Sequence, residues 1–95
     1  MNPAKVRRDK LERLSDLPNV GPAIAADLRR IGIFVPDDLR GKEPWDLYTM
    51  LCDVSGSRHD PCVLDVFISI TDFMEGGEPK VWWAYTGQRK ARYKI

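Results

Sequence analysis

The residues of this 95-residue chain that are best suited to bind a ligand form a short turn, Leu17-Pro18-Asn19-Val20-Gly21-Pro22. Pro18 favours the opening of a turn, and Asn19 tolerates a left-handed backbone conformation. Gly21 has no side chain that would keep a ligand away from the backbone. The pattern therefore predicts a tight turn over residues 17–22 with an accessible backbone.

A helix is expected to start directly after this turn. Pro22 suits its first position because an N–H group there would have no partner, and the N–H groups of Ala23 and Ile24 then remain free. The aligned peptide dipoles give a helix start a partial positive charge, which attracts anions. The chemistry predicted for this stretch is phosphate binding through backbone N–H groups.

Metal-ligand residue types come together once, as Cys52, His59 and Cys62. Structural zinc sites generally have four protein ligands, so we expect no metal site, with a site completed by a carboxylate or by a second subunit as the alternative. Both cysteines are expected to be reduced and to pack as small apolar residues. The alternative for Cys62 is a reactive thiolate in the first turn of a helix.

Catalytic patterns are absent from the sequence. His59 and Asp60 are adjacent, but neighbouring side chains usually point apart, and no known motif ties a nucleophile to them. The chain has no phosphate-binding P-loop and no HExxH or GxSxG signature. We therefore expect that the protein is not an enzyme, with no catalytic residue and no cofactor.

Aromatic residues precede the basic end of the chain. Trp82, Trp83 and Tyr85 lie close in sequence to Arg89 and Lys90, a combination that in single-strand binders stacks bases while cations follow phosphates. The alternative, which we favour, is that the segment folds back and covers the core with its two tryptophan rings, because buried tryptophan contributes much apolar area in a small domain.

Helices must position these residues. Apolar residues recur at near-helical spacing over residues 4–14, which predicts an amphipathic first helix. Proline or aspartate at the starts and glycine at the ends predict further helices at 22–30, 36–40, 44–52 and 61–74, the last being the main core helix. The expected fold is all-α, a single domain over residues 1–95 with about five short helices and an aromatic, basic C-terminal extension over residues 79–95.

A second turn between helices is expected at Val54-Ser55-Gly56, which would give a doubled, SAM-like arrangement of hairpins. Asp60 follows it, at the place where a phosphate would bind, and its charge would repel that phosphate. The second turn is therefore predicted to be a packing element rather than a binding site.

Charge is unevenly distributed along the chain, although the net charge is only +1. Residues 1–36 carry seven Lys or Arg against four Asp or Glu, residues 37–80 carry four against ten, and residues 81–95 carry four with no acid. If the two basic ends shared a face with the turn, they would form the positive surface that nucleic acid requires. No apolar run has the length of a membrane span, and no secretory signal is visible, so a cytoplasmic location without membrane association is expected.

The turn resembles the helix-hairpin-helix family of DNA-backbone binders, whose hairpins commonly read Leu-Pro-Gly-Val-Gly-Pro before a helix with small residues. Asn19 replaces the first hairpin glycine, and Ala23 stands where many DNA-binding members have Lys or Arg. The hairpin half is also similar to the C-terminal domain of the competence regulator TfoX. These resemblances imply the fold and suggest DNA as a partner.

The second half, from Leu51 to Gly56, over Arg58-His59-Asp60-Pro61-Cys62 and on to Trp82-Trp83, resembles a small bacterial family. Its members are labelled helix-hairpin-helix or pathogenicity-locus proteins and sometimes mitomycin resistance proteins, and the resemblance covers roughly residues 12–90. The mitomycin label implies a link to DNA damage.

The resulting hypothesis is non-enzymatic, sequence-independent binding of the DNA backbone. The residues expected to contact DNA phosphates are Asn19, Val20, Gly21, Ala23, Ile24, Arg29, Arg30, Lys5, Arg8, Arg89 and Lys90. The alternative is a protein-interaction adaptor, in which the hairpin is only a fold element and the patch of Trp82, Trp83 and Tyr85 docks on a partner or on a second copy.

Overall fold

A computed structural model describes residues 5–95, and within this range the chain is helical and contains no β-strand. The α-helices are α1 (Pro22–Arg30), α2 (Pro44–Ser55), α3 (Pro61–Met74) and α4 (Thr86–Tyr93). Short 3-10 helices lie at η2 (Arg8–Lys10), η3 (Leu14–Asp16), η4 (Pro36–Leu39) and η5 (Trp82–Tyr85). The predicted all-α class is therefore confirmed. No helix of the described residues is long and apolar enough to cross a membrane.

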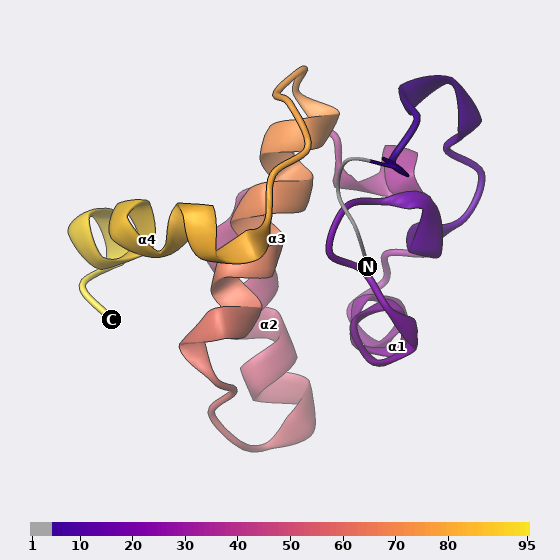
Figure 1. Cartoon of the computed structure of the whole chain (residues 1–95). Coiled ribbons are helices and arrows are strands. Elements are labelled where there is room, and N and C mark those ends of the chain that lie inside the picture. Colours follow the sequence, from indigo (N-terminus) through magenta and orange to yellow (C-terminus); the bar gives the residue numbers. More distant parts are fainter. Residues whose placement is uncertain (1–4) are drawn as a thin grey trace.

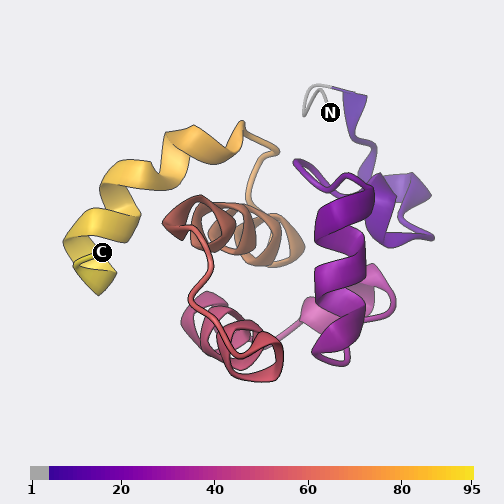
Figure 2. The ribbon, with the colours of Figure 1, turned by 90° about the horizontal axis from the view of Figure 1, so that it is seen from below.

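Helix α3 is the centre of the molecule, as the sequence predicted. It begins where expected, because the Asp60 carboxylate accepts a hydrogen bond of 2.8 Å from the N–H group of Cys62. Ten of its residues are buried, among them Phe67, Ile70 and Phe73. Figures 1 and 2 show α1 and α4 on opposite sides of α3, while α2 packs along it. Both ends of the chain are thus attached to one helix.

Helices α1 and α2 also form where predicted. Helix α1 begins at Pro22 and is followed by Gly32, whose φ of 87° is the left-handed conformation expected after a helix. Helix α2 begins at Pro44 and ends before Gly56, which has a φ of 69°. Between them η4 is a 3-10 helix rather than an α-helix. An apolar face surrounds the turn, because Leu14, Leu17, Val20 and Leu28 are fully buried and Ile24 is half-buried.

The amphipathic first helix predicted over residues 4–14 is wrong for residues 5–14, and residue 4 lies outside the described range. The physical reason is the side chain of Asp16. Its Oδ2 atom accepts hydrogen bonds from the N–H groups of Glu12 (3.0 Å) and Arg13 (2.8 Å), which also lower the pKa of its carboxyl group. An α-helix through this stretch would need those two N–H groups for its own backbone, so only short 3-10 turns form.

The C-terminal segment forms a fourth α-helix that the sequence did not predict. Asp65 on α3 is completely buried, and both of its carboxylate oxygens are bonded to α4. Arg89 Nε donates to Oδ1 at 2.8 Å, and Thr86 Oγ1 donates to Oδ2 at 2.7 Å. This buried ion pair holds α4 against the core.

The expected covering of the core by two tryptophan rings is only partly correct. Tyr85 is buried and Trp82 is half-buried, but 61% of the surface of Trp83 is exposed. At the other end of α4, the ring of Tyr93 stacks on that of Trp45 with 5.3 Å between centroids. Tyr85 and Tyr93, rather than the two tryptophans, therefore dock the C-terminal segment.

We expect the substitution Arg89→Ala to destabilise the protein by about 3–5 kcal/mol, because it leaves the Asp65 carboxylate buried without a cation. Urea denaturation followed by circular dichroism measures this loss. The matched control is Arg92→Ala, which removes an exposed ion pair of 3.4 Å with Glu43 and should cost at most about 1 kcal/mol. Equal losses for the two variants would contradict the structural role of the buried pair.

The three tyrosines of the chain give a pH prediction. Burial raises the pKa of Tyr48, Tyr85 and Tyr93, and at Tyr85 a hydrogen bond of 2.8 Å to Asp72 adds to the effect. Because the folded state holds these protons more tightly than the unfolded state, their contribution to stability is complete below about pH 10 and declines as the pH rises further. Phenolate absorbance should therefore show no tyrosine titrating at its ordinary pKa until the protein unfolds. A tyrosine that ionises normally in the folded protein would refute this prediction.

Candidate functional site

The turn of residues 17–22 has the conformation that its residue types predicted. Asn19 adopts the left-handed region with a φ of 64°, and Gly21 is extended and precedes α1. A Cβ atom placed on Gly21 would meet no atom within 4 Å. The backbone at the start of α1 is therefore open to a ligand on the side of Gly21.

Free N–H groups lie at the start of α1. Ala25 donates its N–H group to the carbonyl oxygen of Gly21 at 3.0 Å, which is the first hydrogen bond of the helix. Within residues 5–95, the N–H groups of Ala23 and Ile24 have no acceptor, and no side chain caps the helix. The first turn of α1 also has no acidic residue. The partial positive charge of this helix start is therefore not compensated by the described part of the protein.

The side chain of Asn19 fixes the turn against distant parts of the chain. Its Nδ2 atom donates to Ser69 Oγ on α3 at 3.1 Å and to the carbonyl oxygen of Lys80 at 2.7 Å. The amide of Asn19 thus has a structural role. Its partners also place the segment around Lys80 beside the turn, as Figure 2 shows for the stretch that joins α3 to η5.

Lys80, whose carbonyl oxygen is bonded to the turn, carries a cation that the sequence did not predict for this site. Its side chain is exposed, with Nζ 5.9 Å from the centre of the Tyr85 ring. No local pattern marks it, because its position depends on a hydrogen bond across 61 residues of sequence. The only indirect signal was the polar residue Asn19 at a position where the hairpin family usually has glycine.

The cations predicted near the start of the chain have different environments. Arg8 donates to the carbonyl oxygens of Phe73 (2.6 Å) and Gly77 (2.7 Å), and its guanidinium lies 4.0 Å from the centre of the Phe73 ring. Arg8 therefore caps the end of α3, a common role for arginine at a helix C-terminus. Lys5 is exposed.

Arg29 and Arg30 are exposed in the last turn of α1. The rise of an α-helix puts them about 10 Å along the axis from the free N–H groups. Arg30 also lies 3.9 Å from Asp27. These two cations therefore lie at the opposite end of α1 from the free N–H groups.

The basic residues of α4 do not flank the turn. Arg89 is buried in its ion pair with Asp65, so the structure contradicts its expected role on a binding surface. Lys90 is exposed, but α4 lies on the side of α3 away from α1 (Figure 1). The hypothesis that the C-terminal cations and the turn form one positive face is therefore not supported for these two residues.

A cluster of chemically active residue types surrounds the loop between α2 and α3. Ser55 Oγ lies 2.8 Å from His59 Nε2 and 2.7 Å from the carbonyl oxygen of Leu51. Ser55 Oγ also lies 3.3 Å from the carbonyl oxygen of Cys52, so the hydroxyl group joins the end of α2 to the histidine ring. We interpret the pair as a clamp on the loop.

The cysteines belong to the same region. Cys52 Sγ accepts the N–H group of His59 at 3.4 Å, and both cysteines are free thiols. Hydrogen bonding to Asp60, together with burial and the charge of that carboxylate, raises the pKa of the Cys62 thiol. The raised pKa disfavours the alternative of a stabilised thiolate at Cys62. Within residues 5–95, no three His, Cys, Asp or Glu side chains gather closely enough to hold a metal ion.

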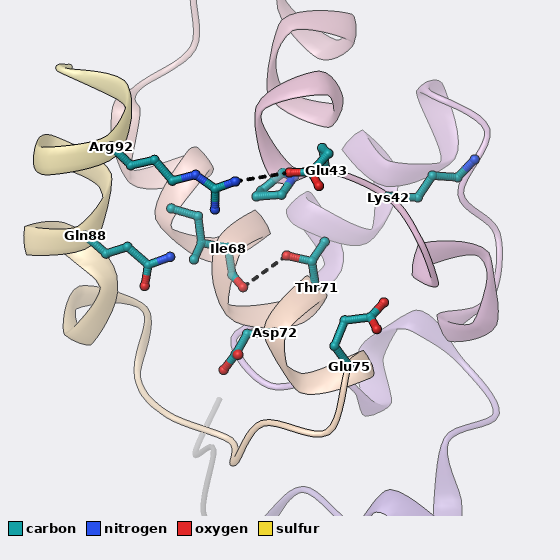
Figure 3. A pocket seen from close by; sticks show the side chains of 9 residues that line it. Lys42, Glu43, Ile68, Thr71, Asp72, Glu75, Gln88 and Arg92 are labelled. Atoms are coloured by element: carbon teal, nitrogen blue, oxygen red, sulfur yellow. Dashed lines mark hydrogen bonds and ion pairs between the residues drawn. The ribbon is translucent and has the colours of Figure 1, made fainter.

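A hollow of about 210 Å³ lies between α2, α3 and α4 (Figure 3). Arg92 reaches across it from α4 toward Glu43, and Asp72 accepts the hydroxyl group of Tyr85. Its walls carry both acidic and basic side chains. Glu43 and Asp72 each have a hydrogen-bond partner within the protein. We therefore assign the hollow no ligand.

Comparisons with known proteins agree with the resemblance drawn from the sequence. The family model Cdd1, described as pathogenicity locus, matches residues 7–91. The mitomycin resistance protein McrB of Streptomyces lavendulae is 42% identical over 77 residues, which are 81% of this chain and 73% of that protein. No solved structure matches the chain. Since the family model spans the turn, α1 and the central helix α3, the chain belongs to the pathogenicity locus family.

Proposed function

We propose that the protein is a non-enzymatic module that binds the DNA backbone without sequence preference, through a helix-hairpin-helix type turn at residues 17–22. The observation that carries this proposal is the pair of free N–H groups of Ala23 and Ile24 at the uncapped start of α1. A phosphate oxygen is the ligand for which such a helix start is suited. The open space at Gly21 leaves room for its approach.

The other helix starts of the protein support this choice by contrast. The start of α3 is occupied by the Asp60 carboxylate, which accepts from Cys62 and would repel a phosphate. The first turn of α2 carries Asp46. Helix α4 also has no carboxylate in its first turn, but it continues directly from η5, whereas α1 follows an extended glycine.

The proposed contacts differ from the set expected from sequence. The turn and the start of α1 remain in the proposed set of contacts, and Lys80 is added from the segment bonded to the turn. Lys5 and Arg29 are kept as exposed cations. Arg8 and Arg89 are omitted because both are committed to contacts inside the protein. The name of the relative, a mitomycin resistance protein, supports a role at DNA, and we propose a cytoplasmic location for such a role.

The substitution Gly21→Asp tests the proposal, and Gly21→Ala is its matched control. Both side chains fit, because the added Cβ meets nothing and the backbone of Gly21 is extended. Aspartate at this N-cap position should take the free N–H groups itself and stabilise α1. We therefore expect Gly21→Asp to lose roughly tenfold or more in DNA affinity while Gly21→Ala retains it.

Fluorescence anisotropy of labelled single-stranded, duplex and junction DNA at low and physiological salt measures this effect. Circular dichroism shows whether both variants are folded. Affinity should fall as salt rises, because phosphate binding releases counterions. Binding of no DNA form at low salt, or equal binding by the two variants, would rule out the proposed site.

A second candidate function, protein interaction, is favoured by exposed apolar side chains. Phe34, Val35, Met50 and Val54 are each at least 43% exposed. Met50 also lines a hollow of about 160 Å³ between the end of α1 and α2. An exposed apolar side chain beside a hollow is suited to a docking surface for another protein. The patch of Trp82, Trp83 and Tyr85 considered at first is less suitable, since Tyr85 is buried.

The substitution Met50→Lys tests this second function. The side chain is 46% exposed, so the fold should tolerate the change. If the surface binds a protein, a partner retained from cell extract by the wild type should be lost with Met50→Lys and kept with the control Lys90→Ala, which alters an exposed residue of α4. Identical protein profiles for wild type and Met50→Lys would contradict a docking role.

A further inference from the structure

We propose that the ligand of the turn is a single-stranded segment of nucleic acid, and that Trp83 is the platform on which one of its bases stacks. This inference rests on the proposed function, since it needs a phosphate held at the start of α1. It adds a base-binding residue and a substrate class to that site. The strand would run from the turn past Lys80 to Trp83.

The first observation is that the turn and the segment before η5 are joined. The hydrogen bond of 2.7 Å from Asn19 Nδ2 to the carbonyl oxygen of Lys80 fixes the two against each other. Trp83 follows Lys80 by three residues, so their Cα atoms lie within about 10 Å. Figure 2 shows the start of α1, the segment after α3 and η5 along one edge of the molecule. The platform and the phosphate site are therefore neighbours.

The second observation is the environment of Trp83. Its surface is 61% exposed, so this large ring contributes little to the core. The half-buried ring of Trp82 meets it nearly at a right angle, at 89° and 5.4 Å between centroids. This contact supports the Trp83 ring while leaving most of it in solvent. An aromatic ring that is held in place and exposed is suited to stack on a base.

The third observation is charge. The carbonyl oxygen of Lys80 is bonded to the turn, and its exposed side chain, with Nζ 5.9 Å from the centre of the Tyr85 ring, gives a cation to the segment that leads to Trp83. Glu78 is the nearest acidic residue in sequence and is also exposed. A cation between a phosphate site and an aromatic ring matches the alternation of phosphate and base along a single strand.

The geometry favours an unpaired strand over a duplex. In a duplex the bases are stacked on one another inside, so a ring beside the phosphate site would meet only sugar and phosphate. A single strand can turn a base outward onto an aromatic side chain. The exposed ring of Trp83 therefore predicts a preference for single-stranded over duplex nucleic acid. The turn alone would not produce this preference.

The experiment uses a labelled oligothymidine and a duplex of the same length, each titrated with the wild type, Trp83→Ala and Trp83→Phe. Removing an aromatic ring on which a base stacks lowers the binding affinity by roughly 5- to 150-fold. We expect Trp83→Ala to lose this much affinity for the single strand and little for the duplex, with Trp83→Phe close to wild type. Tryptophan fluorescence should be quenched by oligothymidine in the wild type and much less in Trp83→Phe.

Phe34→Ala is the matched control, because Phe34 is equally exposed, at 62%, and follows the opposite end of α1 from the turn. It should bind both ligands as the wild type does. If Gly21→Asp abolishes binding but Trp83→Ala weakens neither ligand, or weakens both equally, the phosphate site stands and the stacking platform is wrong. If the wild type binds neither ligand at low salt, the proposed function fails, and this inference fails with it.

Discussion

Two buried polar side chains on α3 need hydrogen-bond partners, and the arrangement of the molecule depends on the elements that provide them. Asp65 and Ser69 are both almost completely buried, and they lie one helical turn apart. Asp65 is bonded by Thr86 and Arg89 of α4, whereas Ser69 accepts from Asn19 of the turn. Buried polar groups without hydrogen bonds are costly, so each of these residues selects the element that can satisfy it. One helix thereby determines the positions of both the turn and the C-terminal segment, and it separates them.

The start of α1 and the start of α3 show how similar local sequences lead to different chemistry. Both helices begin with proline, which leaves the next N–H groups free. At α3 the preceding aspartate accepts one of them, and the helix start becomes part of the packing. At α1 the preceding glycine has no side chain that could accept from Ala23 or Ile24, and its carbonyl oxygen accepts from Ala25. Such an unsatisfied helix end reduces stability in the absence of a ligand, and a bound anion would recover that stability.

Local signals allowed much of the fold to be predicted from the sequence. The bounds of α1, α2 and α3 follow from proline at their starts and from Gly32, Gly56 and Asp60 at their borders, because these residues act on their own neighbours. The first predicted helix failed because the side chain of Asp16 competes for backbone N–H groups, and hydrophobic spacing carries no information about that competition. Helix α4 was missed because it is held by an ion pair rather than by an apolar stripe.

The candidate site could be predicted only where it is local. The turn and the free N–H groups are properties of six to eight consecutive residues, and they appeared as expected. The positions of the cations around them are determined by contacts between distant residues, such as Arg89 with Asp65 and Asn19 with Lys80.

Contacts between distant residues also have a consequence for the order in which the protein folds during its synthesis on the ribosome. The turn is synthesised early, but its anchors at Ser69 and Lys80 follow Asn19 by 50 and 61 residues of sequence. A nascent chain that ends before Lys80 therefore contains the turn without both of its anchors, and the turn becomes fixed only after that residue has been synthesised.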